Sequence, residues 1–516
     1  MKKPVVLAVL DGFGCGDGGP GDAVALAATP NLDHLLARYP HVKLKAHGTA
    51  VGLPSDENTG NSEVGHNALG TGQICWQRAS LVERAIESGE IFRTEGWRLL
   101  VRNCLEHGRP LHLLGLLSDA NDHSHIRHLK ALLRQARQEN LPRVCCHVIL
   151  DGFDTTYPAS EFAAQIEVVL AELRDEAHDY RIVSGGGCLA ITMDRYGADW
   201  AMVERGWNAH VHGVGRQFPD ALTAIRTLGQ EGYADADIPA FVVADANGPI
   251  GTIKNGDSVL LFNFRGDRAE EIARAFDEPA FDKFDRGGVT DVCFVGIMPY
   301  DDNTGLPRHY LVEKPQFRNT MTELFCRAGL REYALSETQK YGHVTYFWNG
   351  NRTGMVDETL ECYEEIPSDP GPAEAKPAMK SVEITDRMVE VLAEGGFDFL
   401  RCNYPNGDMV GHSGNLEAAI AAVEAVDQAL GRLMEAAERY GYVLCIAADH
   451  GNVEKMLDHG QPHVGHSCNP IRFLLCDPDR NHVLGEGPYG LANVAGTIAQ
   501  LLEIQPPDCW EPGMLQ

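Results

Sequence analysis

Short apolar runs that end in an acidic residue or a polar loop alternate with helical stretches along most of this chain, and this alternation limits its fold more than any other feature. The strand-like runs "PVVLAVLDG" (residues 4–12), "FDFLRCNYP" (397–405) and "YVLCIAADHG" (442–451) show the pattern near both ends. Such alternation is typical of an α/β protein with a mainly parallel sheet, in which sites form at the carboxyl ends of the strands. We therefore predict an α/β fold with functional residues directly after these runs.

A second group of strand-like runs occupies the middle of the chain, with helical stretches such as residues 161–173 between them. The runs of this group cover residues 110–120, 143–154, 180–187, 258–268 and 291–298. At 516 residues the chain is too long for one average domain. We predict a discontinuous domain built from residues 1–76 and 313–516, and a domain of residues 77–312 inserted into it.

The composition argues against several classes of partner. There are 44 basic and 73 acidic residues, and the net charge of -29 disfavours binding to nucleic acid or to an anionic membrane. The apolar run near the N-terminus ends at Asp11, which is too early for a signal peptide, and no segment is long enough to cross a membrane. The 14 cysteines include no C-x-x-C pair, so we expect reduced thiols and a cytoplasmic protein.

The stretch "TGNSEVGHNALGTG" (residues 59–72) places Ser62 among several glycines, four residues before His66. One interpretation is structural, because serine commonly caps the start of a helix. The other is a nucleophile at a helix start, where the dipole and the free amides favour an anion such as a phosphoryl group. A serine hydroxyl needs a base or a metal to become a good nucleophile, so the two interpretations depend on its partners.

Candidate metal ligands gather near the C-terminus. "DMVGHSG" holds Asp408 and His412, "AADHGN" holds Asp449 and His450, and "PHVGHS" holds a further pair of histidines, His463 and His466. Imidazoles mixed with carboxylates suit zinc or manganese, and two such groups can build a two-metal site for phosphoryl transfer. Asp11 joins this set if both ends of the chain share one sheet.

These motifs resemble those of the cofactor-independent phosphoglycerate mutases, the metal-dependent branch related to alkaline phosphatase. The similar runs keep the order of the family and extend over nearly the whole chain. They are "LDGFG", "TPNLDHLL", "AVGLPSDENTGNSEVGHNALGTGQ", "GLLSDANDHSHIRHL", "ITMDRYGADW", "FNFRGDRAEEI", "LSETQKYGHVTYFWNG", "NYPNGDMVGHSG" and "ADHGNVEKM".

The resemblance implies an alkaline-phosphatase-like domain that carries two divalent metal ions, for which we expect manganese, and a serine that becomes phosphorylated. It implies that Ser62 is this nucleophile. His66 lies one turn further along, and we expect it only to pack. One metal would be bound by Asp408, His412 and His466, and the other by Asp11, Ser62, Asp449 and His450.

The resemblance also implies that the inserted domain holds an organic acid and that the two domains close on it. Lys340 would meet the phosphate from the phosphatase-like side, and Asp154 would exchange protons with the substrate. The substrate-binding set is His123, Asp154, Arg195, Arg265, Arg268 and Lys340. Arginine suits this role because its planar fork binds two oxygens at once.

Two departures from the family pattern fall in the inserted domain. Phe153 stands in "DGFD" where the family usually has an arginine, and Cys188 stands in "SGGGC" where it usually has a second one. Each lost charged hydrogen bond to an anion costs about 1.5 to 3 kcal/mol, so we expect weaker binding of phosphoglycerate and a more apolar pocket.

The motifs and the two departures leave four functions to consider. The breadth of the match favours a glycolytic phosphoglycerate mutase that interconverts 3- and 2-phosphoglycerate through a phosphoserine. The alternatives are a mutase-like paralogue acting on another phosphorylated or phosphonate acid, and a metal-dependent phosphohydrolase. A non-enzymatic binding role ranks last, because every expected ligand position is filled. We expect a monomer whose partner is a small phosphorylated organic acid.

Overall fold

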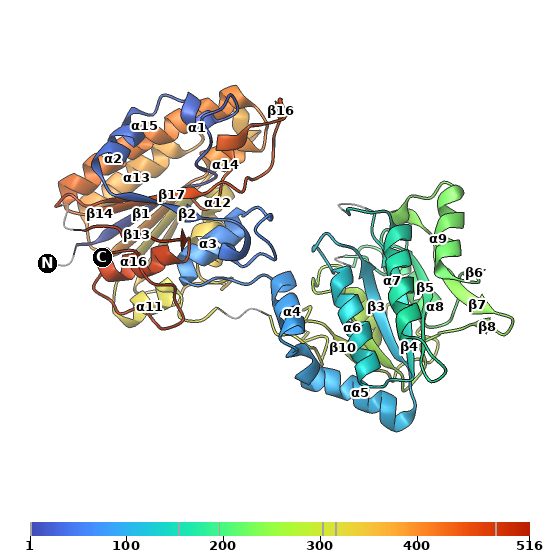
Figure 1. Ribbon diagram of the computed structural model, residues 1–516. Helices are drawn as coiled ribbons and strands as arrows, with labels where there is room; N and C mark the ends of the chain where they lie inside the picture. Colours follow the sequence, from blue (N-terminus) through green and yellow to red (C-terminus); the bar gives the residue numbers. More distant parts are fainter. Residues whose placement is uncertain (1–2, 153–154, 196, 302–303, 315–316, 480–481) are drawn as a thin grey trace. The chain divides into compact units, whose positions relative to one another are not determined.

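Contacts within the chain divide it into two units. Unit 1 comprises Met1–Gln77 and Gln316–Gln516, and unit 2 comprises Arg78–Pro315. The computed structural model describes residues 3–152, 155–195, 197–301, 304–314, 317–479 and 482–516 (Figure 1). Each unit has its own sheet and its own core, so each is described by itself.

Unit 1 is built around an eight-stranded sheet with a parallel centre. Val5 of β1 (Val5–Leu10) pairs with Phe399 of β13 on one side and with Val443 of β14 on the other, so the two ends of the chain meet in the middle of this sheet. In spatial order the strands are β12 (Glu361–Ile366), β11 (Glu332–Glu337), β13 (Phe399–Tyr404), β1, β14 (Val443–Ala447), β17 (Ile471–Cys476), β2 (His41–Lys45) and β18 (Tyr489–Gly490). A small hairpin, β15 (Leu457–Asp458) and β16 (Gln461–Pro462), lies outside the sheet.

Helices cover both faces of this sheet (Figure 1). On one face α13 packs against the long α15, and on the other α16 packs against α3. The helices of the first face are α1 (Ala23–Leu26), α2 (Pro30–Arg38), α13 (Ser381–Glu394), α14 (Asn406–Gly411) and α15 (Leu416–Tyr440). The remaining helices are α3 (Ser62–Thr71), α11 (Met321–Arg327), α12 (Thr338–Gly342) and α16 (Asn493–Leu501).

Burial on both faces explains the apolar character of the central strands. All six residues of β1 are buried, as are the five of β14. A parallel strand covered by helices on both sides needs apolar side chains at successive positions, and each buried Val or Leu contributes about 1.5 to 3 kcal/mol. The polar groups that follow these strands therefore stand at one edge of a rigid sheet.

Unit 2 contains a second, mainly parallel sheet. Strands β10, β9, β3, β4 and β5 run parallel to one another, whereas β7 pairs with β5, and β8 with β7, in the antiparallel sense. In spatial order the strands are β10 (Cys293–Gly296), β9 (Ser258–Leu261), β3 (Leu111–Leu117), β4 (Arg143–Leu150), β5 (Asp179–Gly187), β7 (Phe241–Asp245) and β6 (Arg216–Phe218), and β8 (Gly248–Pro249) pairs with β7.

Two apolar clusters cover the faces of the unit 2 sheet. Leu113 belongs to a cluster with residues of α6 and α7, while its neighbour Leu114 belongs to a second cluster with Trp207 of α8. Alternate residues of a strand point to opposite faces, so one apolar run supplies both clusters. The helices of unit 2 are α4 (Arg78–Glu87), α5 (Glu95–His107), α6 (Ile126–Gln138), α7 (Ala159–Leu173), α8 (Trp200–His210), α9 (Ala221–Gln230) and α10 (Glu270–Asp277).

The predicted fold class is confirmed, because the chain is an α/β protein with two mainly parallel sheets. The runs read as strands near the chain ends form β1, β13 and β14, which are neighbours in one sheet. Among the described residues, no helix has both the length and the apolar character needed to cross a membrane.

Candidate metal and phosphoryl-transfer site

Ser62 is the first residue of α3, and it does not cap that helix. The cap is Asn61, whose side chain accepts a hydrogen bond from the amide of Val64. The interpretation of Ser62 as a helix cap is therefore wrong. Its buried hydroxyl instead lies 3.2 Å from Oδ1 of Asp11 and 2.9 Å from Nε2 of His450. Both contacts are of the kind that could activate a serine.

Three of the expected ligands form one cluster beyond β13. Oδ1 of Asp408, in α14, lies 3.1 Å from Nε2 of His412 and 3.1 Å from Nε2 of His466. The two Nε2 atoms are 3.2 Å apart, so all three donor atoms face one point. Nδ1 of His412 donates to the carbonyl of Val464, so Nε2 is the ring nitrogen that faces the cluster and would bind a cation.

The other expected ligands lie at the ends of β1 and β14. Nε2 of His450 is 3.4 Å from Oδ1 of Asp11 and 3.6 Å from Oδ2 of Asp449. It is also 3.7 Å from Oδ1 of Asp408, so the two clusters adjoin. Unit 1 thus brings all seven predicted metal ligands together. Nδ1 of His463, the alternative to His466, is buried and has no hydrogen-bond partner among the described residues.

Gly12 lets the end of β1, which Asp11 follows, approach the start of α14, which carries Asp408. Its φ is +79°, and a Cβ atom there would lie 2.7 Å from the amide nitrogen of Asp408. That amide donates to the carbonyl of Asp11 across 3.0 Å. A side chain at position 12 would strain the backbone and push β1 and α14 apart.

The ammonium of Lys340, at the end of β11 in α12, lies among the site oxygens. It donates to Oδ1 of Asp11 at 3.1 Å and to Oδ2 of Asp408 at 2.6 Å, and it also contacts the Ser62 hydroxyl. Burial alone would lower the pKa of Lys340, but the charges of Asp11 and Asp408 raise it above its usual range. Lys340 therefore stays charged and compensates the carboxylates.

The same charges act on the cluster residues. Burial alone would raise the pKa of Asp408, but hydrogen bonds from His412 and His466 hold it well below its usual range. For His450, burial lowers the pKa, while the carboxylates of Asp449 and Asp11 raise it to about 9. The site is therefore an anionic pocket that favours cations.

The donor set fits two divalent cations. It combines carboxylates with imidazoles, and two groups of three have donor atoms within 4.8 Å of one another: Asp408, His450 and His466, and Asp11, His66 and Asp449. Oδ2 of Asp449 is buried and has no hydrogen-bond partner among the described residues. An orphaned carboxylate oxygen of this kind is costly unless a cation binds it.

His66 belongs to the second group by distance, since its Nδ1 lies 3.2 Å from Oδ2 of Asp449. Both of its ring nitrogens are nevertheless engaged, Nδ1 with the carbonyl of Ser62 at 2.8 Å and Nε2 with the amide of Asn403 at 3.1 Å. The ring is fully buried and therefore positions its neighbours. We leave it outside the ligand set, in line with the expectation that it packs.

Sequence reasoning missed a layer of amide and carboxyl groups behind the ligands. Asn403 donates to Oδ2 of Asp11 at 2.9 Å, and Asn452 donates to Oδ1 of Asp408 at 3.2 Å. Glu454 accepts from the backbone amides of Asn452 and Gly14. These residues lie inside the matching motifs, but a lone Asn or Glu carries no charge pattern or spacing that distinguishes it from a surface residue.

In unit 2, two of the predicted acid-binding residues lie together after β3 and β9. Nε2 of His123 is 3.2 Å from Asp122, and its Nδ1 is 3.6 Å from Asp267. Arg265 pairs with the same two carboxylates, at 3.1 Å for Asp267. Asp122 and Asp267 were not predicted, and they orient the side chains of His123 and Arg265.

Another pair lies after β5 and β9. Arg268 donates to the carbonyl of Met193 at 2.9 Å, two residues before Arg195, whose side chain is exposed. Cys188 is 4% exposed and packs in an apolar cluster, and burial raises the pKa of its thiol to about 12. It therefore offers no charge to an acid. Phe153 and Asp154 lie outside the described residues.

Comparison with known proteins gives one consistent family. Residues 3–506 match the model of the metalloenzyme superfamily. The chain is 45% identical to a probable 2,3-bisphosphoglycerate-independent phosphoglycerate mutase of Leptospira interrogans and 45% identical to the 2,3-bisphosphoglycerate-independent phosphoglycerate mutase of Trypanosoma brucei brucei, in each case over 100% of this chain and 98% of the relative.

A solved structure agrees with these relatives. The crystal structure of Leishmania mexicana phosphoglycerate mutase at low cobalt concentration is 42% identical, superposes with a TM-score of 0.67, and is covered over 98% of its length by 100% of this chain. The chain therefore belongs to the metalloenzyme superfamily and, within it, to the 2,3-bisphosphoglycerate-independent phosphoglycerate mutases.

Proposed function

We propose that this protein interconverts 3- and 2-phosphoglycerate and that Ser62 carries the phosphoryl group between the two halves of the reaction. The observation that carries the proposal is the position of the Ser62 hydroxyl, buried at the start of α3 and in contact with Asp11, His450 and Lys340. The names of relatives that match the whole chain favour a mutase over a paralogue with another substrate or a phosphohydrolase.

In the first half of the reaction, Ser62 Oγ loses its proton and bonds to phosphorus while the bond from phosphorus to the substrate oxygen breaks, and that oxygen takes up a proton, so that no proton is consumed overall. The Lys340 ammonium beside Oγ stabilises the deprotonated serine. The free amides at the start of α3 favour the anionic phosphoryl group. When bound, two divalent cations supply positive charge that activates the serine oxygen and neutralises the phosphoryl oxygens.

In the second half, a different hydroxyl of the glycerate attacks the phosphoserine, and Ser62 is released. We propose manganese for both cation positions, with Asp408, His412 and His466 holding one ion and Asp11, Ser62, Asp449 and His450 the other. The donor set supports two cations, and manganese rests on the resemblance alone.

The acid has to be retained between the two halves of the reaction. We propose that His123, Arg195, Arg265 and Arg268 hold its carboxylate and hydroxyls. Asp154 would move protons to and from the substrate oxygens. The pairing of His123 and Arg265 with shared carboxylates supports a preorganised grip in unit 2.

The wider setting that we propose is glycolysis in the cytoplasm, with the enzyme acting as a monomer. All 14 cysteines are free thiols, which supports a reducing compartment. The proposed substrate is the small phosphorylated acid itself.

The test is an assay of the purified protein on 3-phosphoglycerate with manganese. The unmodified protein should form 2-phosphoglycerate, and phosphate should be found on the Ser62 peptide by mass spectrometry after rapid quenching. Ser62→Ala should lose at least a thousandfold in kcat, whereas Ser381→Ala, a buried serine at the start of α13, should keep its activity. Release of inorganic phosphate without 2-phosphoglycerate would instead identify a phosphohydrolase, and full turnover by Ser62→Ala would disprove the nucleophile.

A further inference from the structure

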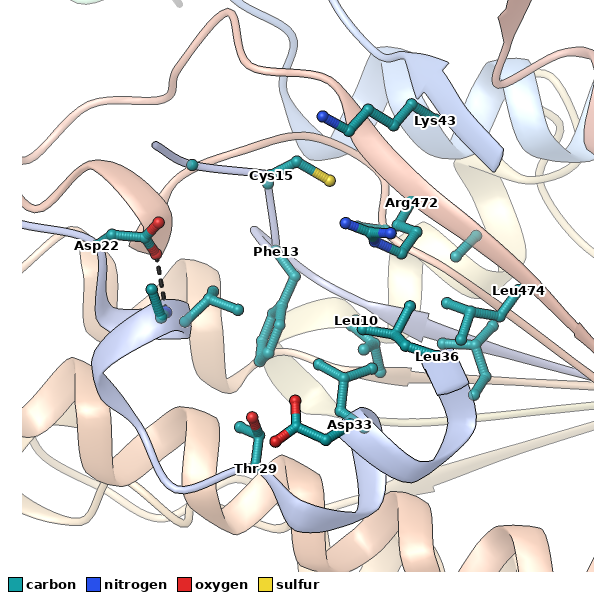
Figure 2. Close-up of a pocket in the computed structure, with 18 of the residues that line it drawn as sticks. Leu10, Phe13, Cys15, Asp22, Thr29, Asp33, Leu36, Lys43, Arg472 and Leu474 are labelled. Atoms are coloured by element: carbon teal, nitrogen blue, oxygen red, sulfur yellow. Dashed lines mark hydrogen bonds between the residues drawn. The ribbon is translucent and has the colours of Figure 1, made fainter. Parts of the chain in front are cut away.

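A cavity of about 300 Å³ lies in unit 1 beside the loop that follows β1 (Figure 2). Its size falls at the lower end of the range for small-molecule pockets. Residues from the loop, from α1 and α2, and from β2, β14 and β17 line it. None of the seven proposed metal ligands is among them, so this cavity is separate from the phosphoryl-transfer site.

The cavity has an apolar body and a cationic end. Phe13, Leu36 and Leu474 project along its middle, while Lys43 and Arg472 lie together at one end with Cys15 (Figure 2). An apolar body with a few convergent polar groups is the usual composition of a site for a small organic ligand.

The two cations are forced together by the sheet. Arg472 of β17 stands directly opposite Lys43 of β2 in an antiparallel pair. Like charges at directly opposed positions destabilise a sheet unless an anion compensates them. In the part of the chain that the structure describes, no ion pair joins either cation to a carboxylate, although the chain has 73 acidic residues. The exposed Lys43 and the half-buried Arg472 therefore form a positive patch at the mouth of the cavity that no carboxylate of the described residues pairs with.

The other polar groups of the cavity do not neutralise this end. Burial raises the pKa of the Cys15 thiol, so the thiol beside Arg472 is neutral. The Asp22 carboxylate accepts from the amides of Gly18 and Ala25, where it caps α1. Asp33 lies at the end away from Lys43 (Figure 2). An anion that enters the cavity is therefore drawn to the Lys43 end and repelled from the Asp33 end.

We propose that this cavity binds a small amphipathic carboxylate, such as a medium-chain fatty acid, with its carboxylate between Lys43 and Arg472 and its apolar chain against Phe13, Leu36 and Leu474. The planar fork of Arg472 suits two carboxylate oxygens, and Lys43 adds a second charge. Burial of the methylene groups supplies the rest of the affinity. This site goes beyond the proposed mutase function, and none of the seven proposed metal ligands takes part in it.

The test is calorimetric titration of the full chain, loaded with manganese and an excess of 3-phosphoglycerate, with octanoate. Octanoate should bind, whereas 1-octanol and inorganic phosphate, which each carry half of the recognised chemistry, should bind at least tenfold more weakly. The double variant Lys43→Met/Arg472→Met should lose at least tenfold in affinity. The matched control is Lys45→Met on the same strand, whose ammonium pairs with Asp56 outside the cavity and whose loss should leave octanoate affinity unchanged.

Four results would overturn the proposal. They are the absence of octanoate binding, equal affinity in the double variant, displacement of octanoate by 3-phosphoglycerate, and phosphate binding as tight as that of octanoate, which would indicate a site for bare anions. If the double variant does not fold, Leu36→Trp, which fills the cavity and keeps both cations, gives the same decision. It should weaken octanoate binding at least tenfold while the rate of phosphoglycerate turnover stays unchanged, and equal octanoate affinity in this variant would also disprove the site.

Discussion

Lys340 is a buried cation that stands among the carboxylates of the metal site, with 5% of its side chain exposed. Its removal leaves Asp11 and Asp408 as buried anions that repel each other. Lys340 therefore affects the stability of unit 1 as well as its proposed catalytic role. Its effect on stability depends on which other cations are bound.

We predict that Lys340→Met lowers the free energy of unfolding of unit 1 by about 3 to 5 kcal/mol in the presence of a chelator, and by much less with manganese, because a bound cation replaces the lost charge. Calorimetric melting in both conditions measures the difference. Lys376→Met removes a 72% exposed lysine of the same unit and should change stability little in either condition. Equal losses for Lys340→Met with and without metal would contradict this account.

Glu271, in α10, is a second residue whose burial affects stability, because its carboxyl group has few partners. Burial raises the pKa of its carboxyl to about 7, and only Oε1 has a partner among the described residues, the amide of Gly197 at 3.0 Å. A carboxyl whose pKa is higher in the folded than in the unfolded state binds more protons when folded. Stability is therefore lost as the pH rises from about 4.5 through about 7.

Glu271→Gln keeps the acceptor for Gly197 and removes the charge. We predict that the variant is about 1 to 2 kcal/mol more stable than the unmodified protein at pH 8 and equally stable at pH 5. Thermal unfolding at the two pH values measures this. A variant that is less stable at pH 8 would show that the charged carboxylate has a favourable partner.

At the scale of elements, a chain of buried hydrogen bonds ties four elements of unit 2 together. His112 of β3 contacts His147 of β4 at 2.9 Å, His147 contacts Ser184 of β5 at 2.7 Å, and Ser184 contacts His210 of α8 at 2.8 Å. His210 then contacts the hydroxyl of Thr192 at 3.0 Å, and Thr192 has a φ of +66°. These hydrogen bonds thus hold Thr192, whose backbone is strained, three residues before Arg195.

This series of hydrogen-bonded histidines makes unit 2 sensitive to acid. Burial lowers the pKa of His210 to about 3 and that of His147 well below its usual range. These histidines therefore bind protons in the unfolded state but stay neutral in the folded state. The free energy of unfolding falls as the pH drops below about 6.5, by about 1.4 kcal/mol per pH unit for each such histidine.

We predict that His210→Gln is less stable than the unmodified protein at pH 7, because its hydrogen bonds are altered, but loses stability less steeply between pH 6.5 and 4. Denaturant unfolding of unit 2 at several pH values gives the slope. His107→Gln, which changes an exposed histidine of α5, should leave the slope unchanged. An unchanged slope in His210→Gln would show that this histidine is protonated in the folded protein.

The sequence predicts elements well where each element carries its own signal. β1, β13 and β14 are apolar runs that end in functional polar residues, and they are central strands of one sheet. The histidine chain could not be predicted, because His147 lies inside an apolar strand and its partners come from other elements. β2 was also missed, since "HVKLK" is half exposed and has a weak strand pattern.

At the scale of the whole molecule, the seven proposed metal ligands all belong to unit 1. Their prediction depended on motifs that match a family over nearly the full chain, whereas spacing alone left His463 and His466 equivalent. The resemblance selected His466, and the folded chain agrees with that choice, because it places Nε2 of His466 3.1 Å from Oδ1 of Asp408. The roles assigned to these ligands and to the residues of unit 2 stay predictions.

Metal removal should accordingly affect one unit only. We predict that a chelator increases amide hydrogen exchange in β1, β13 and β14 but not in β3, β4 and β5. A ligand at a hundred times its dissociation constant stabilises the fold that binds it by about 2.7 kcal/mol. Mass spectrometry of exchange with manganese or with EDTA measures both sheets in one sample. Equal loss of protection in both sheets would show that the units do not unfold independently.

The pairing of β1 with β13 and β14 also decides the order of events during synthesis. Val5 leaves the ribosome long before its partner Phe399 exists, and at 5 to 20 residues per second the interval is roughly 20 to 80 s. Arg78–Pro315 emerges in one piece within that time and can close its own sheet. Throughout the interval β1 is an apolar strand of a nascent chain with neither neighbour made, so this protein relies on protection of its first strand until its last third is translated.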